Sequence, residues 1–495
     1  MTKTKVAVIG LDGCSPRYLE KIINYGFVPT IRSIVEKYGY YKLYAFPPCT
    51  PPSWSSIMTG VNPGKHGIFG FQHYDKRGKR VYLTNTMHLE HPRVHEMLGM
   101  NGIPSIMINP IPSYPIIPVK NTIQISHMFF TPRLTWYPSE IGKYAKLLEE
   151  HNYRSKTRDE LLERASSILD KYIELVENLT EKLEWQLFWI NLHYPDTILH
   201  HFDEEWVFEK PYYLEGKIFG KIDHIVKILS EQSDYTILVS DHGFAHYYKI
   251  ININSYLYSK GYTRKAVGDR GLREFWEHRQ TEDHFAVRNK MILKLANTRI
   301  VGKLMGRVKR ISEKILGKKI KITEYNVDTI RSKAFLLSTY SHGVIVNDIT
   351  VKDHVARELR MLEGIKYVVP SSKMFNGYYV ERAPDLLVIP DYDKGYSLGK
   401  NKISYIVIRR REINNHHPIG IFIINTNDHE HMKEMIIPNY AVTNIIMLLL
   451  NQQPSYQADG LRIAEKITGK KIYKLKNYNA WNILKKLAKV GVSKV

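Results

Sequence analysis

Short apolar runs alternate with longer amphipathic stretches along most of the 495 residues, and this alternation limits the folds that the chain can adopt. Short runs are typical of strands buried on both faces, and amphipathic stretches with the 3.6-residue period are typical of helices. A capping-box pattern at Thr157–Glu160 opens one predicted helix, and apolar positions from Ile218 to Leu229 predict another. Alternation of this kind predicts a mainly parallel sheet covered by helices, which is an α/β fold. Six runs are predicted to be strands: Lys5–Leu11, Ser105–Asn109, Gln186–Leu192, Thr236–Ser240, Leu386–Ile389 and Gly420–Asn425.

Polar side chains that could carry chemistry come directly after three of these strands. Asp12 follows the first strand, His193 to Asp196 follow Gln186–Leu192, and Asp241 with His242 follows Thr236–Ser240. In open α/β sheets the ligand crevice lies outside the carboxyl ends of the strands. We therefore expect these groups to converge on one site.

The segment from Phe46 to Gly67 carries the densest motif, Phe-Pro-Pro-Cys-Thr-Pro-Pro-Ser-Trp followed by Thr59-Gly60. Prolines and glycines predict a loop, and a short helix is predicted from about Ser53 to Met58. A hydroxyl or thiol at a helix N-terminus is stabilised as an anion by the free N–H groups, which makes Thr50 a candidate nucleophile. The structural alternative is that Thr50 or Ser53 is an N-cap residue.

Three further motifs have the residue types and spacing of metal ligands. Asp196 and His200 are four residues apart, which places them on one side of a helical turn. Asp241 and His242 lie on a turn just beyond a strand, and His416 comes shortly before the apolar run at Gly420. Each motif alone is more often structural, but together they predict a metal site.

The distribution of charge along the chain predicts how it divides into domains. The formal charge is +22, and residues 288–319 hold eleven Lys and Arg against one Glu, without strand signals. We expect a catalytic core in two parts, 1–262 and 328–470, interrupted by a basic helical insertion at 263–327 and followed by a basic C-terminal tail at 471–495. The insertion could attract an anionic substrate, nucleic acid or an anionic membrane, or it could be a solvated surface.

The two cysteines are too few for a disulfide-stapled secreted scaffold, and hydrophobic residues make up an ordinary 43% of the chain. The N-terminal apolar run is too short for a signal peptide, and no run has the roughly 18–20 apolar residues of a membrane span. These features favour a cytoplasmic location.

In order along the chain, the motifs resemble those of the type I phosphodiesterase/nucleotide pyrophosphatase branch of the alkaline phosphatase superfamily. The matching pieces are Gly10–Gly13, Thr50–Gly67, Asn109–Pro115, Asp196–Phe202, Ser240–Phe244, Asn252–Asn254, His416–Gly420 and Ala458–Gly460. The resemblance implies an alkaline-phosphatase-like three-layer α/β/α sandwich and two divalent metal ions, expected to be zinc with manganese as the alternative. It implies Asp196, His200 and His416 as ligands of one ion, and Asp12, Thr50, Asp241 and His242 as ligands of the other.

The resemblance further implies that Thr50 attacks phosphorus and forms a phosphothreonine that water then hydrolyses. Cys49-Thr-Pro51 also looks like the start of the sulfatase signature, in which the cysteine is converted to formylglycine. Thr50, however, stands nine residues before Thr59-Gly60, the spacing of the nucleophile in both families, and Ser53 stands where the sulfatase signature has arginine. The sequence therefore favours Thr50 over Cys49.

Two neighbours of Thr50 are expected to contact substrate. Ser53 occupies the position at which related nucleotide pyrophosphatases have an asparagine that contacts a phosphate oxygen, so transition-state contacts here depart from the family pattern. Trp54 could form an apolar wall for the second ester substituent, or it could be a core residue.

The leading prediction is a phosphodiesterase or pyrophosphatase that acts on a nucleotide-like phosphoester. One alternative is another hydrolase of the superfamily, namely a phosphomonoesterase, a phosphonate hydrolase or a sulfatase. A different class of alternative is a basic nucleic-acid-binding or membrane-binding protein with a degenerate site. The sequence leaves the oligomeric state open.

Overall fold

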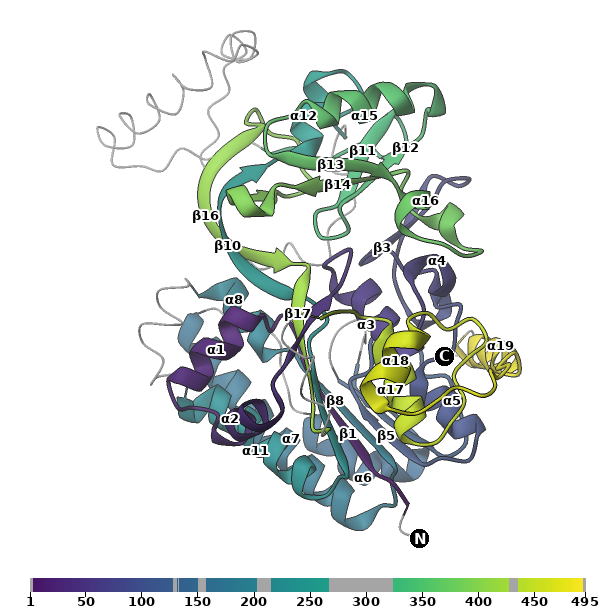
Figure 1. The fold of residues 1–495 in the computed structure, drawn as a ribbon. Helices are drawn as coiled ribbons and strands as arrows, with labels where there is room; N and C mark the ends of the chain where they lie inside the picture. Colours follow the sequence, from purple (N-terminus) through teal and green to yellow (C-terminus); the bar gives the residue numbers. More distant parts are fainter. Residues whose placement is uncertain are drawn as a thin grey trace.

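The computed structural model describes residues 3–127, 131, 133–149, 157–202, 215–266, 324–426 and 435–492. Two lobes are visible in Figure 1: a large one built on a wide sheet, and a smaller one above it. Residues 267–323, most of the predicted basic insertion, lie outside the described residues.

The large lobe is built on a nine-stranded sheet. Seven of its strands run in one direction, while β17 pairs antiparallel with β9 and β2, and β7 pairs antiparallel with β6. The sheet is therefore mainly parallel, as predicted. In spatial order its strands are β18 (Ile436–Pro438), β2 (Tyr41–Tyr44), β17 (Ile419–Ile424), β9 (Tyr235–Val239), β1 (Val6–Leu11), β8 (Leu187–Leu192), β5 (Ser105–Ile108), β6 (Thr122–Ser126) and β7 (Thr135–Tyr137).

Helices cover both faces of this sheet because its central strands are apolar on both faces. In β1, Ala7 and Ile9 belong to one core cluster, whereas Val6 and Val8 belong to a second cluster on the opposite face. The first face is packed by α1 (Pro16–Asn24), α2 (Pro29–Tyr38), α6 (Gly142–Ala145), α7 (Arg158–Lys182), α8 (Tyr194–His201) and α11 (Gly220–Glu231). The second face is packed by α3 (Thr50–Thr59), α5 (Val94–Met100), α17 (Ala441–Leu449) and α18 (Leu461–Thr468). This is the predicted three-layer α/β/α sandwich, with one layer of helices on each face.

The predicted helix signals agree with the structure in detail. The hydroxyl of Thr157 caps α7 by accepting a hydrogen bond from the backbone N–H of Glu160. The predicted helix at 218–229 is α11, preceded by one π-helical turn at Glu215–Phe219. The helix predicted to start near Ser53 begins three residues earlier, at Thr50.

The smaller lobe is inserted between β9 and β17. A three-stranded sheet of β15 (Tyr396–Leu398), β10 (Gly243–Ile251) and β16 (Ile408–His417) rises from the large lobe, and Figure 1 shows β10 and β16 as the curved pair that joins the lobes. Above it lies a four-stranded sheet of β11 (Ala334–Ser338), β12 (Gly343–Val346), β14 (Leu386–Pro390) and β13 (Ile365–Pro370), with α12 (Ile253–Ser259), α15 (Lys352–Arg360) and α16 (Ser371–Met374). The predicted strand Leu386–Ile389 is thus β14 of this lobe and not a strand of the main sheet.

Two peripheral parts complete the described chain. A hairpin of β3 (Gln72–Asp75) and β4 (Arg80–Leu83) follows α4 (Pro63–His66). Residues from 471 onward, predicted as a basic tail, end in a folded helix, α19 (Trp481–Val492), whose Trp481 is buried against Ile117 and Val119. None of the described helices is long and apolar enough to cross a membrane.

Candidate active site

Strand ends of the main sheet bring the predicted site residues together. Asp12 follows β1, Asp196 and His200 lie on α8 just after β8, and Asp241 with His242 follows β9. These three strands are parallel neighbours, so their carboxyl ends meet at one edge of the sheet.

His416 reaches the same edge by a different route. It lies at the end of β16, three residues before β17 begins. Because β17 is antiparallel to β9, its first residues lie beside the carboxyl end of β9. The close approach also explains a motif glycine: a Cβ on Gly243 would lie 1.9 Å from the carbonyl oxygen of Ile419.

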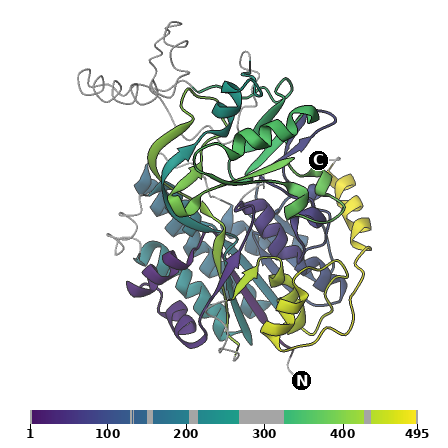
Figure 2. The same ribbon diagram turned by 45° about the horizontal axis from the view of Figure 1, so that its top comes forward.

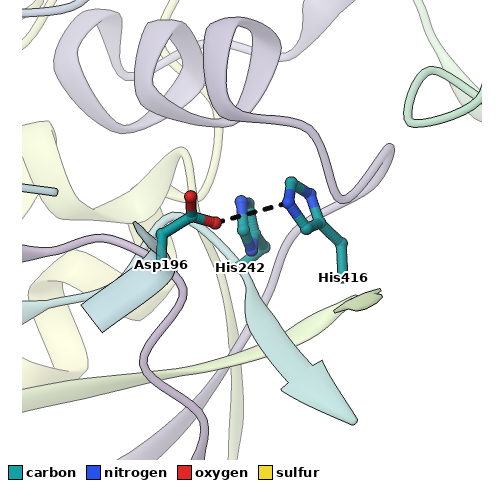
Figure 3. Close-up of side chains that lie close together, drawn as sticks. All are labelled: Asp196, His242 and His416. Atoms are coloured by element: carbon teal, nitrogen blue, oxygen red, sulfur yellow. Dashed lines mark ion pairs between the residues drawn. The ribbon is translucent and has the colours of Figure 1, made fainter. Parts of the chain in front are cut away.

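The first cluster of possible metal ligands consists of Asp196, His242 and His416, whose ligand atoms all lie within 4.8 Å of one another. Figure 3 shows Asp196 and His416 directed toward each other with His242 beside them. Nε2 of His416 lies 3.4 Å from Oδ1 of Asp196. His200 joins this cluster, since its Nε2 is 3.4 Å from the same Asp196 oxygen and 3.0 Å from Nε2 of His416.

The second cluster consists of Asp12, Asp241 and His242, again within 4.8 Å. Nε2 of His242 lies 3.6 Å from Oδ1 of Asp12 and 3.4 Å from Oδ2 of Asp241. The backbone N–H of Gly13 donates to Oδ1 of Asp241. His242 belongs to both clusters, so the two sets of ligands are adjacent.

Backbone contacts determine which imidazole nitrogens face the site. Nδ1 of His242 lies 3.1 Å from the carbonyl oxygen of Gly243, and Nδ1 of His416 lies 2.8 Å from the carbonyl oxygen of Pro48. A carbonyl oxygen only accepts, so each Nδ1 must carry the proton in these contacts. Each Nε2 therefore faces the cluster, where it can offer a lone pair when the imidazole is neutral.

Burial dominates the electrostatics of the second cluster. Burial raises the pKa of Asp241 well above its usual range, and the neighbouring Asp12 carboxylate raises it further. Burial and the nearby His416 lower the pKa of His242 to about 3, so its imidazole is neutral at pH 7.

In the first cluster, charge pairing overcomes burial. Burial alone would raise the pKa of Asp196, but His200 and His416 hold it well below its usual value. Burial alone would lower the pKa of His200, yet the Asp196 carboxylate raises it. Asp196 therefore carries a negative charge inside the protein.

Thr50 is the first residue of α3, and its hydroxyl faces both clusters. Oγ1 of Thr50 lies 3.5 Å from Nε2 of His242, the imidazole that the clusters share. The N-cap of α3 is Cys49, and no side chain caps the helix. Thr50 is therefore not an N-cap residue, and the positive end of the helix dipole lies at its hydroxyl.

The other residues predicted around Thr50 are placed differently. Ser53 is buried, and its hydroxyl donates to the carbonyl oxygen of Pro47. Trp54 is fully buried and packs edge-on against Trp189, the arrangement expected of a core residue. Cys49 is also fully buried, and burial raises the pKa of its thiol well above the usual value.

Two residues outside the predicted set of metal ligands contact the clusters. His193, the first residue after β8, pairs with Asp12 through Nδ1, and its position directly after a strand was the available signal. Tyr340, between β11 and β12 of the smaller lobe, stacks on His416 with ring centroids 4.3 Å apart. No spacing or periodicity in the sequence links Tyr340 to His416.

Other residues of the recognised motifs have structural roles. Asp459 accepts hydrogen bonds from Asn62 and forms an ion pair with Lys65, which fixes the start of α4. Asn109 donates to the hydroxyl of Tyr172 and accepts from the backbone N–H of His127. These contacts hold loops beside the site but do not enter it.

Solved structures with the same fold confirm the architecture. Human ectonucleotide pyrophosphatase/phosphodiesterase 5 superposes with a TM-score of 0.55 at 14% identity, covering 94% of this chain and 99% of that chain. Phosphonoacetate hydrolase from Sinorhizobium meliloti 1021, in complex with phosphonoformate, gives a TM-score of 0.54 at 13% identity over 91% and 95%. An inactive variant of the murine phosphodiesterase 5 in complex with AMP gives 0.53 at 13% identity over 91% and 96%. The fold is therefore alkaline-phosphatase-like.

Comparison of the sequence with family models gives a match over most of the chain, whereas no curated protein matches this sequence. The family model described as type I phosphodiesterase/nucleotide pyrophosphatase matches residues 6–417, which include all seven predicted metal ligands. The chain thus belongs to the type I phosphodiesterase/nucleotide pyrophosphatase family, and it is a phosphoester hydrolase.

Proposed function

We propose that this protein cleaves phosphodiester or pyrophosphate bonds in nucleotide-like small molecules, with Thr50 as the nucleophile and two divalent metal ions as cofactors. The observation that carries the proposal is the position of the Thr50 hydroxyl. It lies at the N-terminus of α3 and faces His242, which belongs to both ligand clusters. The family is metal-dependent, and its substrates are phosphoesters.

The residues present fit a pair of divalent cations. Oδ2 of Asp241 is buried and makes no hydrogen bond within the described residues, and the buried oxygens of Asp12 have imidazole nitrogens as neighbours. Nε2 of His416 and Nε2 of His200 lie 3.0 Å apart and face the same carboxylate, Asp196. Buried carboxylates gathered in one place are costly unless cations lie among them.

The donor set also indicates the class of metal. Nitrogen and carboxylate ligands suit zinc, and manganese is the alternative. One ion would be held by Asp196, His200 and His416, and the other by Asp12, Asp241, His242 and Thr50. When bound, such ions lower the pKa of a hydroxyl and neutralise charge on phosphoryl oxygens.

The chain's own residues position the nucleophile for in-line attack. As the bond from Thr50 Oγ1 to phosphorus forms, the bond from phosphorus to the leaving oxygen breaks. Water then attacks the phosphothreonine at phosphorus and releases the Thr50 hydroxyl. Thr50 is only 2% exposed, so bulk water has little access to its oxygen before substrate arrives.

The surroundings of Thr50 favour a diester over a monoester. A dianionic monoester needs more positive charge around its nonbridging oxygens. Lys65, the basic residue nearest in sequence after Thr50, is already paired with Asp459. Arg411, the nearest of the arginines before His416, lies five residues back along extended β16, which is roughly 16 Å at about 3.3 Å per residue. The arginines of β16 therefore do not supply that charge.

Metal content tests whether His416, and not the neighbouring His417, is a metal ligand. We expect about two divalent ions per purified chain. His416→Ala removes metal and lowers turnover at least about 100-fold, because one ligand of the first cluster is lost. Metal analysis by plasma mass spectrometry checks the first result and a turnover assay the second.

His417→Ala is the matched control. The His417 ring accepts from the backbone N–H of Ile419 and lies against Tyr392, outside both clusters. Loss of metal from His417→Ala with retention in His416→Ala would refute the assignment.

The nucleophile is tested by replacing Thr50 and its neighbour. Thr50→Ala lowers kcat by at least about 10³-fold, because no other described hydroxyl hydrogen-bonds with the imidazole ring of His242. Cys49→Ala keeps most activity, since its thiol is buried and protonated. Steady-state kinetics measures both, and retained folding is checked by circular dichroism. Formylglycine at position 49 in a peptide mass map would instead place the reaction with the sulfatases.

Matched aryl esters test whether the enzyme prefers a phosphodiester to a phosphomonoester. We predict that kcat/KM for a bis-aryl phosphate exceeds that for the aryl phosphate by at least about tenfold, which is about 1.4 kcal/mol in the transition state. An aryl phosphonate ester belongs in the same panel, because phosphonoacetate hydrolase shares the fold. Equal or faster turnover of the monoester with the same metal would contradict the diesterase proposal while leaving the phosphohydrolase assignment intact.

A further inference from the structure

The C-terminal helix α19 is apolar on two opposite faces, and only one of them is covered. Its inner face packs on the large lobe through Trp481 and Ala488, next to Ile117 and Val119. On the outer face, Ile483 is 64% exposed and Leu487 is 60% exposed. Residues four apart lie on one side of a helix, so these two form an exposed aliphatic stripe.

Uncompensated lysines surround this stripe. Residues 466–489 contain eight lysines and no acidic residue. Lys486 and Lys489 of α19 and Lys471 and Lys474 before it are exposed, and none forms an ion pair with a described residue. Lys485, in contrast, faces inward and is paired with Glu90.

Further apolar side chains extend the surface toward the preceding segment. Tyr473 is 88% exposed and lies between Lys471 and Lys474 in the sequence, whereas Leu475 is 38% exposed and lies between Lys474 and Lys476. Figures 1 and 2 show α19 along the outer margin of the large lobe, where a flat partner could reach its outer face. We call residues 471–475 together with Ile483, Lys486, Leu487 and Lys489 the C-terminal surface.

We propose that the C-terminal surface docks the enzyme on an anionic lipid bilayer, with α19 lying in the interface. A helix binds a membrane surface when aliphatic side chains enter the acyl boundary and flanking lysines contact anionic head groups. Both features are present here, and none of the described helices could instead span the bilayer. Docking would localise the enzyme to a membrane surface without taking part in the chemistry.

The composition of the surface favours lipid over nucleic acid. Nucleic-acid surfaces use arginine and aromatic side chains for phosphate contacts and base stacking. Residues 466–489 contain no arginine, and the C-terminal surface has one exposed aromatic side chain, Tyr473, against the aliphatic Leu475, Ile483 and Leu487. Aliphatic side chains gain more from an acyl environment than from a phosphate backbone.

Vesicle flotation of the full-length protein tests this proposal. We expect flotation with vesicles of phosphatidylcholine mixed with phosphatidylserine, and little with phosphatidylcholine alone. The double variant I483Q/L487Q keeps the charge but lowers the partition coefficient about tenfold or more, because two aliphatic side chains no longer enter the bilayer. K486Q/K489Q lowers it by a similar factor and reduces its dependence on salt.

Matched variants elsewhere control for general effects of the substitutions. Ile349 and Met361 of the smaller lobe are 65% and 83% exposed. The variant I349Q/M361Q therefore removes a similar amount of exposed apolar surface at positions distant in sequence from α19. K373Q/K400Q removes two exposed lysines that form no ion pair with a described residue. Both control variants should float within about twofold of the unmodified protein. Phosphoester turnover in solution should be unchanged in all four variants, which shows that the active site is intact.

Three results would overturn the proposal. The unmodified protein could fail to float with anionic vesicles. It could float equally well after the α19 substitutions, which would place lipid contact in another basic part of the chain. Finally, the α19 variants could lose retention on DNA, or lose a dimer seen by analytical ultracentrifugation, with no flotation of the unmodified protein.

Discussion

Three buried carboxylates at one edge of the sheet are the constraint on which the rest of this structure depends. Asp12, Asp196 and Asp241 are at most 7% exposed, and within the described residues their partners are imidazoles, backbone groups and, for Asp12 and Asp241, each other. Burying such charges without cations costs several kcal/mol for each ion. The surrounding fold brings these candidate metal ligands together and keeps the Thr50 hydroxyl beside them.

Several features of the scaffold follow from this requirement. Neighbouring parallel strands bring their carboxyl ends together, and the reversed strand β17 adds His416 from the opposite chain direction. Gly243 allows the backbone after β9 to pass close to Ile419. Pro48, two residues before Thr50, accepts the Nδ1 proton of His416, so the loop that holds Thr50 also orients this imidazole. The smaller lobe contributes Tyr340, which covers the outer face of the same imidazole.

Much of this arrangement could be predicted from the sequence, because the strands that carry ligands are apolar runs that end in Asp or His. The same local signals cannot report the sheet to which a strand belongs. Leu386–Ile389 resembles a central strand of the main sheet yet pairs with β12 and β13 in the smaller lobe. The direction of β17, the burial of Trp54 and the contact between Tyr340 and His416 depend on tertiary packing between distant segments. Likewise, the basic composition after residue 470 did not reveal a helix with one packed face and one exposed aliphatic face.

The central claim is that the two adjacent ligand clusters each hold a divalent ion beside Thr50. Anomalous X-ray scattering from crystals grown with zinc tests it most directly. The account predicts two anomalous peaks, one among Asp196, His200 and His416 and the other among Asp12, Asp241 and His242, with the Thr50 hydroxyl next to the second. Zinc bound only elsewhere on the chain, with both clusters empty, would contradict it.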